Sequence, residues 1–482
     1  MLGRISGKVW SISFAVGLAL TVEAVSLVAS LCTPSPAWAA PSPFGPQPQP
    51  GTAARAPGPT TTTATTPTTT DAPPPEATPA EANAVAVSEV NDSVSLAEVF
   101  DILKQRSPRY KAVQYEVEIA KSEGQAARVL PNPVLNLAIL YLNQGFNQNG
   151  VATYYANVTL PLLIAGQRRM RVKTANVGVR AAEANVRANY HDIAHEARQR
   201  FAELQAAQER VAVLDAAIAD LARLQAMINE RRRSGVESEY DTVRLAIEGS
   251  SLKVRRVEQL AEAEDIAGRL GVLLGVSSWY PRAEGEFKEL GVDVNPDRMW
   301  PQVERTQPGI EAARREEAHA VKGIDLAKRE RWPVPAMTVG TVAIQNYYSI
   351  STTVGLTVPI PVFDWGQGLL ARANARSQHA RLHKDAVVAE TQAELRRAAR
   401  LLAHRREAAR TFEQEIFGKM ATMQQMAEDS YRGGQSQLDD LLDANRARFE
   451  VKLTHVGMIE AVLKAEIDVL AVTGRIEEIN PR

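Results

Sequence analysis

The sequence predicts an internally duplicated α+β membrane protein, in which short alternating strands and very long helices occur twice in the same order. Matching prolines, glycines and aspartates recur after two hundred residues, and the last two pairs are one residue out of step. The pairs are Pro108 and Pro308, Pro133 and Pro333, Gly166 and Gly366, Gly235 and Gly434, and Asp241 and Asp440. A fixed period marks a structural repeat. We expect repeat 1 over 94–290 and repeat 2 over 291–482.

The N-terminal region predicts export. Arg4 and Lys8 precede an apolar run over 9–22, and Ala37-Trp38-Ala39 offers a cleavage site, so residues 1–39 are expected to be a signal peptide. The one cysteine, Cys32, precedes that site, which excludes a disulfide framework in the mature chain. Residues 40–93 are rich in proline and threonine and predict a disordered tether.

Four runs, two in each repeat, have the length and alternation of strands. They cover about 134–142, 153–162, 335–345 and 349–358. Runs with one apolar and one polar face suit the wall of a membrane-spanning β-barrel. Because lipid requires every backbone group to be paired, four strands cannot close a barrel alone. Three copies would supply twelve strands, and the same symmetry would gather the helices into a tube.

The helical stretches are very long. From Gly166 to Arg232 there is no proline and little glycine, so a continuous helix would extend roughly 100 Å. Apolar residues recur in steps of seven, as in a coiled coil. They are Val186 and Ile193, then Leu204, Val211 and Ile218, then Leu214, Leu221 and Ile228. An ordinary soluble coiled coil would account for these helices but not for the paired strands.

Each second strand leads to its long helix through a proline and a glycine. Pro161 and Gly166 mark this junction in repeat 1, and Pro359 and Gly366 mark it in repeat 2. Proline lacks the N–H that a sheet requires, so it ends the strand, and glycine allows the turn before the helix begins. We interpret all four residues as structural.

Four motifs carry a resemblance to a known family. They are VLPNPVLNL (129–137), LPLLIAGQRRMRV (160–172), VPIPVFDWGQGLLARA (358–373) and GGQSQLDDLLDANRARFEVK (433–452). With the doubled layout, they make residues 94–475 resemble the TolC-like outer-membrane efflux proteins. The first and third motifs are most similar to the outer-membrane components of heavy-metal efflux systems of the cobalt-zinc-cadmium and copper-silver type.

The resemblance implies a homotrimer in the outer membrane of a Gram-negative cell, with a twelve-stranded β-barrel in lipid and a trimeric α-helical barrel in the periplasm. It implies a passive exit duct for heavy-metal cations, coupled to a periplasmic adaptor protein and an inner-membrane transporter of the resistance-nodulation-division type. No cofactor is implied. The formal net charge of −1 gives no support for a nucleic-acid partner.

The segment RGGQSQLDDLLDANR (432–446) concentrates three aspartates after two glycines. Ser436 and Asp439 have the spacing of a capping box, as do Ser238 and Asp241 in repeat 1. If Asp440 and Asp443 face the axis of a trimer, each forms a ring of three carboxylates that favours cations.

The family places a D-x-x-D pattern, matched here by Asp440 and Asp443, at the narrow periplasmic end of the duct. By the same resemblance, Asp241 and Tyr431 match residues that help to hold the duct shut, and Asp439 supports the same region. Ser436 stands where the family can have a basic residue, and Arg432 is a candidate substitute.

Catalytic and metal sites are not assigned from the sequence. No nucleophile–base pair, phosphate loop or closed ligand set occurs, so an enzyme is not expected. His191 and His195, and likewise His379 and His383, are spaced to share one helix face. Two histidines do not complete a zinc site, so we interpret both pairs as solvated residues of long helices and leave metal contact open.

Two alternatives remain. Multidrug efflux or type I protein export would use the same architecture, because a passive duct carries few cargo ligands. From a different class, the chain could be a periplasmic coiled-coil adaptor or scaffold without a barrel. The alternating strands and the proline–glycine junctions favour the duct.

Overall fold

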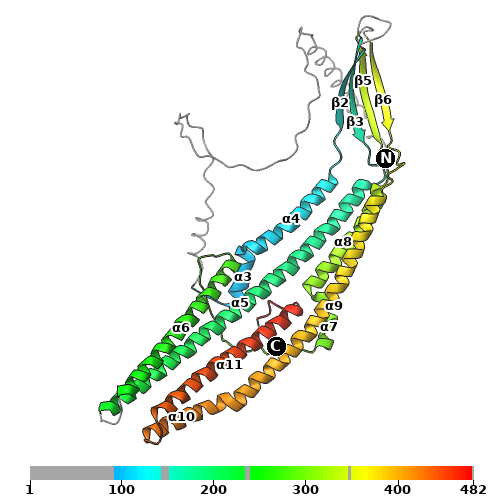
Figure 1. The fold of residues 1–482 in the computed structure, drawn as a ribbon. Helices are drawn as coiled ribbons and strands as arrows, with labels where there is room; N and C mark the ends of the chain where they lie inside the picture. The colour runs from blue at the N-terminus through cyan, green and yellow to red at the C-terminus, as the bar shows by residue number, and fades with distance from the viewer. Residues whose placement is uncertain (1–91, 143–150, 234–238, 346–348, 480–482) are drawn as a thin grey trace, which may run out of the picture. The chain divides into compact units, whose positions relative to one another are not determined.

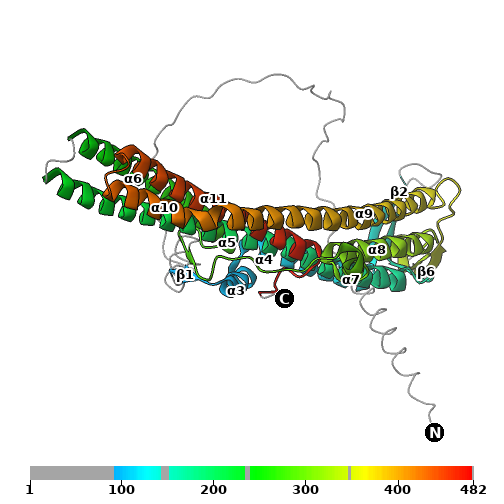
Figure 2. The same ribbon diagram turned by 90° about the horizontal axis from the view of Figure 1, so that it is seen from below.

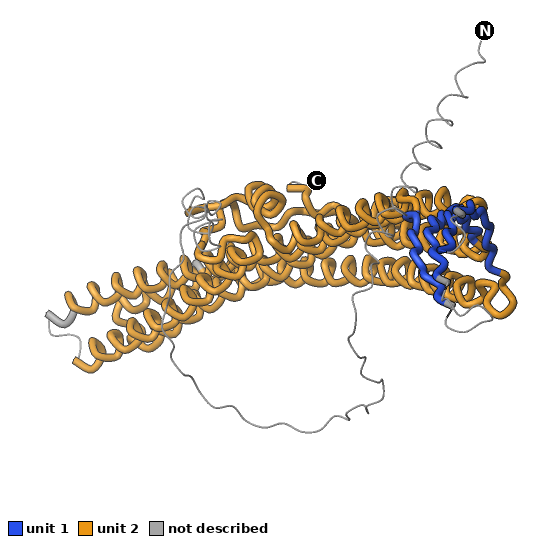
Figure 3. The backbone as a smooth tube through the Cα atoms, turned by 90° about the horizontal axis from the view of Figure 1, so that it is seen from above, with its two compact units in different colours: residues 1–77, 131–162, 334–359 blue, residues 78–130, 163–333, 360–482 orange. Residues whose placement is uncertain are grey.

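The computed structural model describes residues 92–142, 151–233, 239–345 and 349–479 (Figure 1). The predicted signal peptide, nearly all of the predicted tether, and Gly235 and Ser238 lie outside the described residues. The chain forms two compact units, drawn in different colours in Figure 3. One, the strand unit, holds residues 131–162 and 334–359, and the other, the helical unit, holds residues 163–333, 360–479 and the segment up to Leu130. Each unit therefore draws on both predicted repeats.

The strand unit is a four-stranded antiparallel sheet in the order β2-β3-β5-β6. Its strands are β2 (Val134–Leu142), β3 (Val151–Pro161), β5 (Ala336–Ile344) and β6 (Ser349–Thr357). Every strand pairs with its neighbour in the chain order, so β2 and β6 form the two open edges.

The register sorts the side chains of the sheet into an apolar and a polar face. Because side chains alternate along a strand, residues directly opposite one another share a face. One row across the sheet is Ile139, Tyr154, Ala343 and Ile350. A row on the other face, three residues away along each strand, is Asn136, Asn157, Gly340 and Thr353. On the polar face, hydroxyls hydrogen bond between strands, as in the 3.1 Å contact of Thr159 with Thr338.

The helical unit repeats one set of helices. In the first set are α3 (Leu96–Arg106), α4 (Pro108–Arg128), α5 (Gln167–Arg233) and α6 (Glu239–Leu274). In the second set are α7 (Pro296–Thr306), α8 (Pro308–Glu330), α9 (Gln367–Phe412), the π-helical η1 (Glu413–Phe417), α10 (Gly418–Arg432) and α11 (Leu438–Val472). Two-residue strands β1 (Ser93–Val94) and β4 (Arg282–Ala283) pair in parallel. Of the helices in the described part of the chain, none combines the length and the apolar character needed to cross a membrane.

The same local signals divide the helices in both sets. Pro108 and Pro308 begin α4 and α8, because proline is tolerated at the first helical position, and Ser107 and Gln307 cap the same two helices through their side chains. At the far ends of α6 and α11, Gly275 and Gly474 adopt positive φ values of 87° and 76°. The predicted duplication is therefore visible in the helix boundaries.

The predicted heptad seam of α5 is largely buried. Val186, Ile193, Leu204, Leu214, Leu221 and Ile228 are all less than a tenth exposed, while Val211 and Ile218 are half-buried. Ile193 and Leu204 belong to a core that α5 shares with α6, and Leu214, Leu221 and Ile228 belong to a core that α5 shares with α6 and α11. The seven-residue spacing therefore reports packing between helices of the unit.

The segment between the two helix sets is fixed by one buried carboxylate. Glu466 of α11 is fully buried and accepts hydrogen bonds from the backbone N–H groups of Leu290, Gly291 and Val292, at 2.6, 2.9 and 3.3 Å. Arg406 of α9 forms an ion pair with the same carboxylate. A buried charge requires such compensation, and here it ties the connecting segment to the bundle.

Candidate functional site

The acidic segment lies at the turn between α10 and α11, close to the start of α6, at one end of the helical unit (Figure 2). As expected, the Gly433-Gly434 pair ends the incoming helix. Gly434 has a φ of 72°, and the N–H groups of Gly434 and Gln435 donate to the carbonyls of Tyr431 and Ser430 at 3.1 and 2.9 Å. This pattern is a Schellman motif, which glycine favours because its φ is positive.

The predicted capping box of Ser436 and Asp439 is wrong. Helix α11 begins at Leu438, its N-cap is Gln437, and the Gln437 N–H donates to Asp440 Oδ2 at 3.1 Å. The cap lies one residue later than predicted because the Schellman turn extends through Gln435. The capping acid is therefore Asp440, and the buried Ser436 hydroxyl makes no hydrogen bond with the described residues.

Asp439 has a different role from the one that capping suggested. Its carboxylate forms an ion pair with Arg244 of α6 at 2.5 Å. Two turns along α11, Arg446 pairs with Glu248 of α6, and this hydrogen-bonded pair holds the pKa of Glu248 below its usual value. These pairs join α6 to α11. With the offset that matches Asp241 to Asp440, Arg244 of repeat 1 corresponds to Asp443 of repeat 2. This difference in charge between the repeats is visible in the sequence, but the pairing of Arg244 with Asp439 is not.

Asp440 and Asp443 are exposed and lie three residues apart on α11. The Asp443 side chain is 72% exposed and approaches Arg446 of the same helix at 3.5 Å. Residues three apart on a helix are neighbours on its surface, so the two carboxylates present one acidic face.

Tyr431 is the buried member of the predicted set. It is 2% exposed and belongs to a core with Leu438, Leu441 and Leu442, together with residues of α5 and α6. Asp241 lies in the first turn of α6 and is half-buried. The structure thus brings all five predicted tip residues to the same end of the helical unit, with Tyr431 below the surface and Asp440 and Asp443 on it.

The junction glycines have the predicted conformation. Gly166 and Gly366 have φ values of 75° and 80° directly before α5 and α9. The turn of repeat 2 is further held by Arg331, whose Nε donates to the Trp365 carbonyl at 3.0 Å and whose guanidinium lies 4.7 Å from the centre of the Trp365 ring. Pro161 is the last residue of β3, and Pro359 is the second residue after the end of β6.

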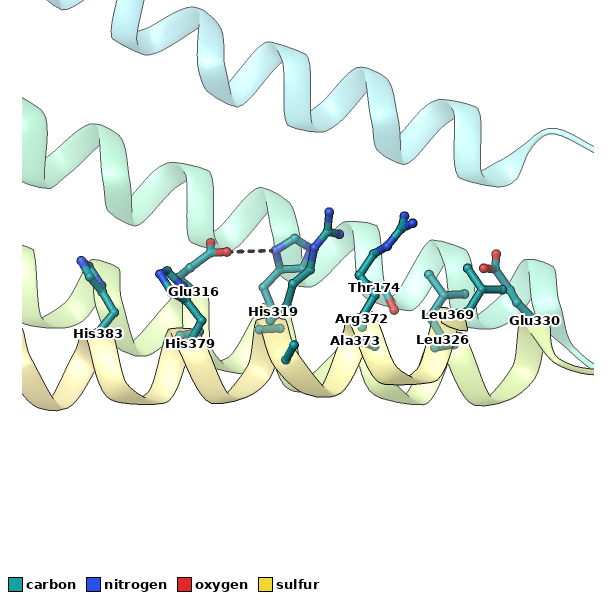
Figure 4. Close-up of a pocket in the computed structure, with 16 residues that line it drawn as sticks. Thr174, Glu316, His319, Leu326, Glu330, Leu369, Arg372, Ala373, His379 and His383 are labelled. Atoms are coloured by element: carbon teal, nitrogen blue, oxygen red, sulfur yellow. Dashed lines mark ion pairs between the residues drawn. The ribbon is translucent and has the colours of Figure 1, made fainter. Parts of the chain in front are cut away.

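The two histidine pairs have different surroundings. His195 contacts Asp468 at 3.0 Å and Gln199 at 3.0 Å, and His191 is 7% exposed. His379 and His383 are exposed on α9 and line a groove of about 870 Å³ with residues of α8 (Figure 4). As the side chains are placed, no three His, Cys, Asp or Glu groups among the described residues converge on a single metal position.

Comparison with known proteins shows one related sequence and a shared fold. No protein-family model matches the chain. It is 23% identical over 362 residues to the cobalt-zinc-cadmium resistance protein CzcC of Cupriavidus metallidurans, covering 74% of this chain and 85% of CzcC.

Solved outer-membrane channels share the fold of this chain. The outer-membrane channel OprN superposes with a TM-score of 0.65 at 18% identity, covering 80% of this chain and 91% of its own. CusC, whose structures were described in relation to transmembrane channel formation, superposes with a TM-score of 0.64 at 16% identity, covering 78% of this chain and 91% of its own. VceC of Vibrio cholerae superposes with a TM-score of 0.61 at 16% identity, covering 79% of this chain and 96% of its own. These likenesses agree with the resemblance that the sequence motifs indicated.

Proposed function

We propose that this chain is a TolC-like outer-membrane efflux channel and serves as the passive exit duct of a tripartite efflux system. In this proposal an inner-membrane transporter of the resistance-nodulation-division type supplies the energy, and a periplasmic adaptor connects it to the duct. The observation that carries the proposal is the duplicated order of strands and helices, in a fold that this chain shares with known outer-membrane channels.

We propose that three copies assemble around one axis. Edges β2 and β6 leave backbone groups without sheet partners, and a sheet in lipid must pair every such group, so the edges favour closure with further copies. Helix α6 also carries an exposed apolar row, in which Tyr240, Ile247 and Val254 recur every seven positions. Val243 and Val257, which are exposed as well, are fourteen positions apart.

Twelve strands from three chains would close the proposed barrel. Native mass spectrometry of detergent-extracted protein should show the trimer. A monomer that persists across detergents would contradict this assembly.

Within this assembly, Asp440 and Asp443 form the proposed cation-selective ring at the narrow end of the duct. Their exposure in the single chain leaves them available to line an axis, and the ion pair of Asp439 with Arg244 anchors the segment that carries them. Rings of like carboxylates favour cations and bind multivalent ones.

The double variant Asp440→Ala/Asp443→Ala should lower cation selectivity and relieve block by multivalent cations in single-channel recordings. Asp385→Ala, which removes an exposed acid on α9, serves as the control and should leave both properties unchanged. Unchanged selectivity and block in the double variant would remove the ring.

Heavy-metal cations are the proposed cargo. This assignment rests on the relative whose name specifies cobalt, zinc and cadmium and whose length is largely matched by this chain. A deletion strain should become sensitive to zinc, cobalt or cadmium salts and should recover when the gene is restored. Sensitivity confined to organic drugs would instead favour multidrug efflux through the same duct.

A further inference from the structure

The groove between α8 and α9 collects three histidines and one glutamate that are separated in the sequence. His319 and Glu316 come from α8, and His379 and His383 come from α9. Figure 4 shows Glu316, His379 and His383 next to one another toward one end of the groove, with His319 beside Glu316. The spacing of the α9 pair was visible in the sequence, but the residues of α8 join it only through the fold.

The two α9 histidines are already oriented alike. Their rings are nearly parallel, with an interplanar angle of 13° and centroids 6.2 Å apart. Histidines at i and i+4 lie on one helix face, where a single ion can reach both rings. Both side chains are exposed, so a change of rotamer would not disturb a packed core.

Glu316 lies between the two groups of histidines. Its carboxylate Oε1 is 3.9 Å from His319 Nδ1, within the range of an ion pair. A carboxylate oxygen and imidazole nitrogens of both helices thus lie in one groove, and both are ligand types of divalent transition metals.

His319 is positioned by a third helix. A Cβ atom at Gly178 of α5 would lie 3.1 Å from His319 Nε2, so the bare backbone of Gly178 makes room for the imidazole ring. The glycine of α5 thus allows His319 to stay over the groove.

The other histidine pair of the same spacing does not offer these groups. His195 is engaged by Asp468 and Gln199, and His191 is buried. The difference between the pairs is one of availability: the α9 rings are accessible and have a carboxylate and a third imidazole nearby.

We propose that Glu316, His319, His379 and His383 form a binding site for a divalent transition-metal cation of the zinc and cobalt class. Imidazole nitrogen and carboxylate oxygen are the ligand types that these ions take in proteins. Since the four side chains do not converge as placed, binding requires His379 and His383 to rotate toward Glu316. Arg372 and Arg376 line the rest of the groove, so the cation is expected at the end that holds Glu316 and His383.

This site adds a cation-binding step to the proposed function. It rests on that function in one respect, because efflux would supply the cations that the site binds. It lies on the helical unit, on residues other than Asp440 and Asp443, and would hold a cation without the trimer axis.

Titration of the purified full-length protein in detergent with ZnCl₂ and CoCl₂ tests the site. Calorimetry should show a zinc site in each chain, and bound Co²⁺ should give visible absorption of a nitrogen-ligated ion. Loss of a ligand should weaken binding by about tenfold or more, in His379→Gln/His383→Gln and in Glu316→Gln. His404→Gln, which removes an exposed histidine of α9 outside the groove, is the matched control and should bind as the parent does.

Equal affinity in the parent and the His379→Gln/His383→Gln variant, or no binding by the parent, would overturn the proposal. Binding that is lost only in Asp440→Ala/Asp443→Ala would also overturn it, because the ion would then occupy the tip. Circular dichroism of each variant checks that the helices remain. The deletion-strain experiment is independent of these outcomes, so failure of the site and failure of the efflux function are distinguishable.

Discussion

The two repeats contain the same elements but build their long helices differently. In repeat 1, α5 continues without interruption from Gln167 to Arg233, whereas in repeat 2 the corresponding stretch is divided into α9, η1 and α10. A π-helical segment within a helix often marks a functional site and a place where the helix bends. We infer that α5 is the stiffer helix and that the α9–α10 helix deforms at Glu413–Phe417.

The π-helical segment has a specific partner on α11. His455 stacks on Phe417 with ring centroids 4.4 Å apart, and Phe412 lies 6.4 Å from the same ring. A bend at η1 would therefore change the contact of α10 with α11, which carries the acidic tip. The two repeats therefore share the order of their elements, while repeat 2 carries the π-helical segment and the three clustered aspartates.

The two repeats also differ at Glu466, whose counterpart in repeat 1 is the buried Ala267. Glu466→Ala should lower the free energy of unfolding by about 3–5 kcal/mol, because it leaves Arg406 and three N–H groups without their acceptor. Denaturation followed by circular dichroism measures the loss. Glu466→Gln, which keeps an acceptor oxygen, should cost less, and equal stability of Glu466→Ala and the parent would show that the carboxylate does not fix the connecting segment.

A second prediction compares the glycines that end α6 and α11. Alanine at either position costs roughly 1–2 kcal/mol, since a left-handed conformation crowds Cβ. At Gly275 the new Cβ would also lie 2.8 Å from the Arg106 carbonyl oxygen, whereas at Gly474 the nearest atom is Pro308 Cδ at 3.3 Å. Gly275→Ala should therefore lower the unfolding temperature more than Gly474→Ala, and the reverse order would show that the two turns do not bear the strain described.

The smallest effect on stability is expected when the pH is lowered, at the ion pair of Glu248 and Arg446 near the tip. The folded-state pKa of Glu248 is lowered by Arg446, so this pair stabilises the tip above the ordinary value of 4.5 and loses its contribution as the pH falls below it. Relative to the intrinsic exchange rate at each pH, hydrogen exchange of the α6 and α11 amides should accelerate below about pH 4.5.

Glu248→Gln, which lacks the titrating group, should show less of that acceleration at the amides near Arg446. An identical pH profile in this variant and the parent would assign the change to other carboxylates.

The sequence predicts periodic features of this fold well and single contacts poorly. The helix after Gly166 and the alternation of the strands follow from residue spacing, which a helix or strand translates directly into faces. The N-cap of α11 was misplaced by one residue because the length of the Schellman turn depends on backbone geometry. The pairing of Asp439 with Arg244, and of Glu316 with His319 near the α9 histidines, depends on how helices pack and has no signature in local sequence.

The order β2-β3-β5-β6 has a consequence for the ring of copies proposed above. The inner contact of β3 with β5 joins repeat 1 to repeat 2, and the free edges β2 and β6 also belong to repeats 1 and 2. Each seam between chains, where β6 of one chain would pair with β2 of the next, would then correspond to the contact of β3 with β5 inside each chain, because both join a hairpin of one repeat to a hairpin of the other. Six hairpins, alternately from repeat 1 and repeat 2, would form the wall. A substitution on β2 in one chain and one on β6 in its neighbour would meet at a single seam. Trimers mixed from a β2 variant and a β6 variant should therefore contain one seam with both substitutions and one seam with neither.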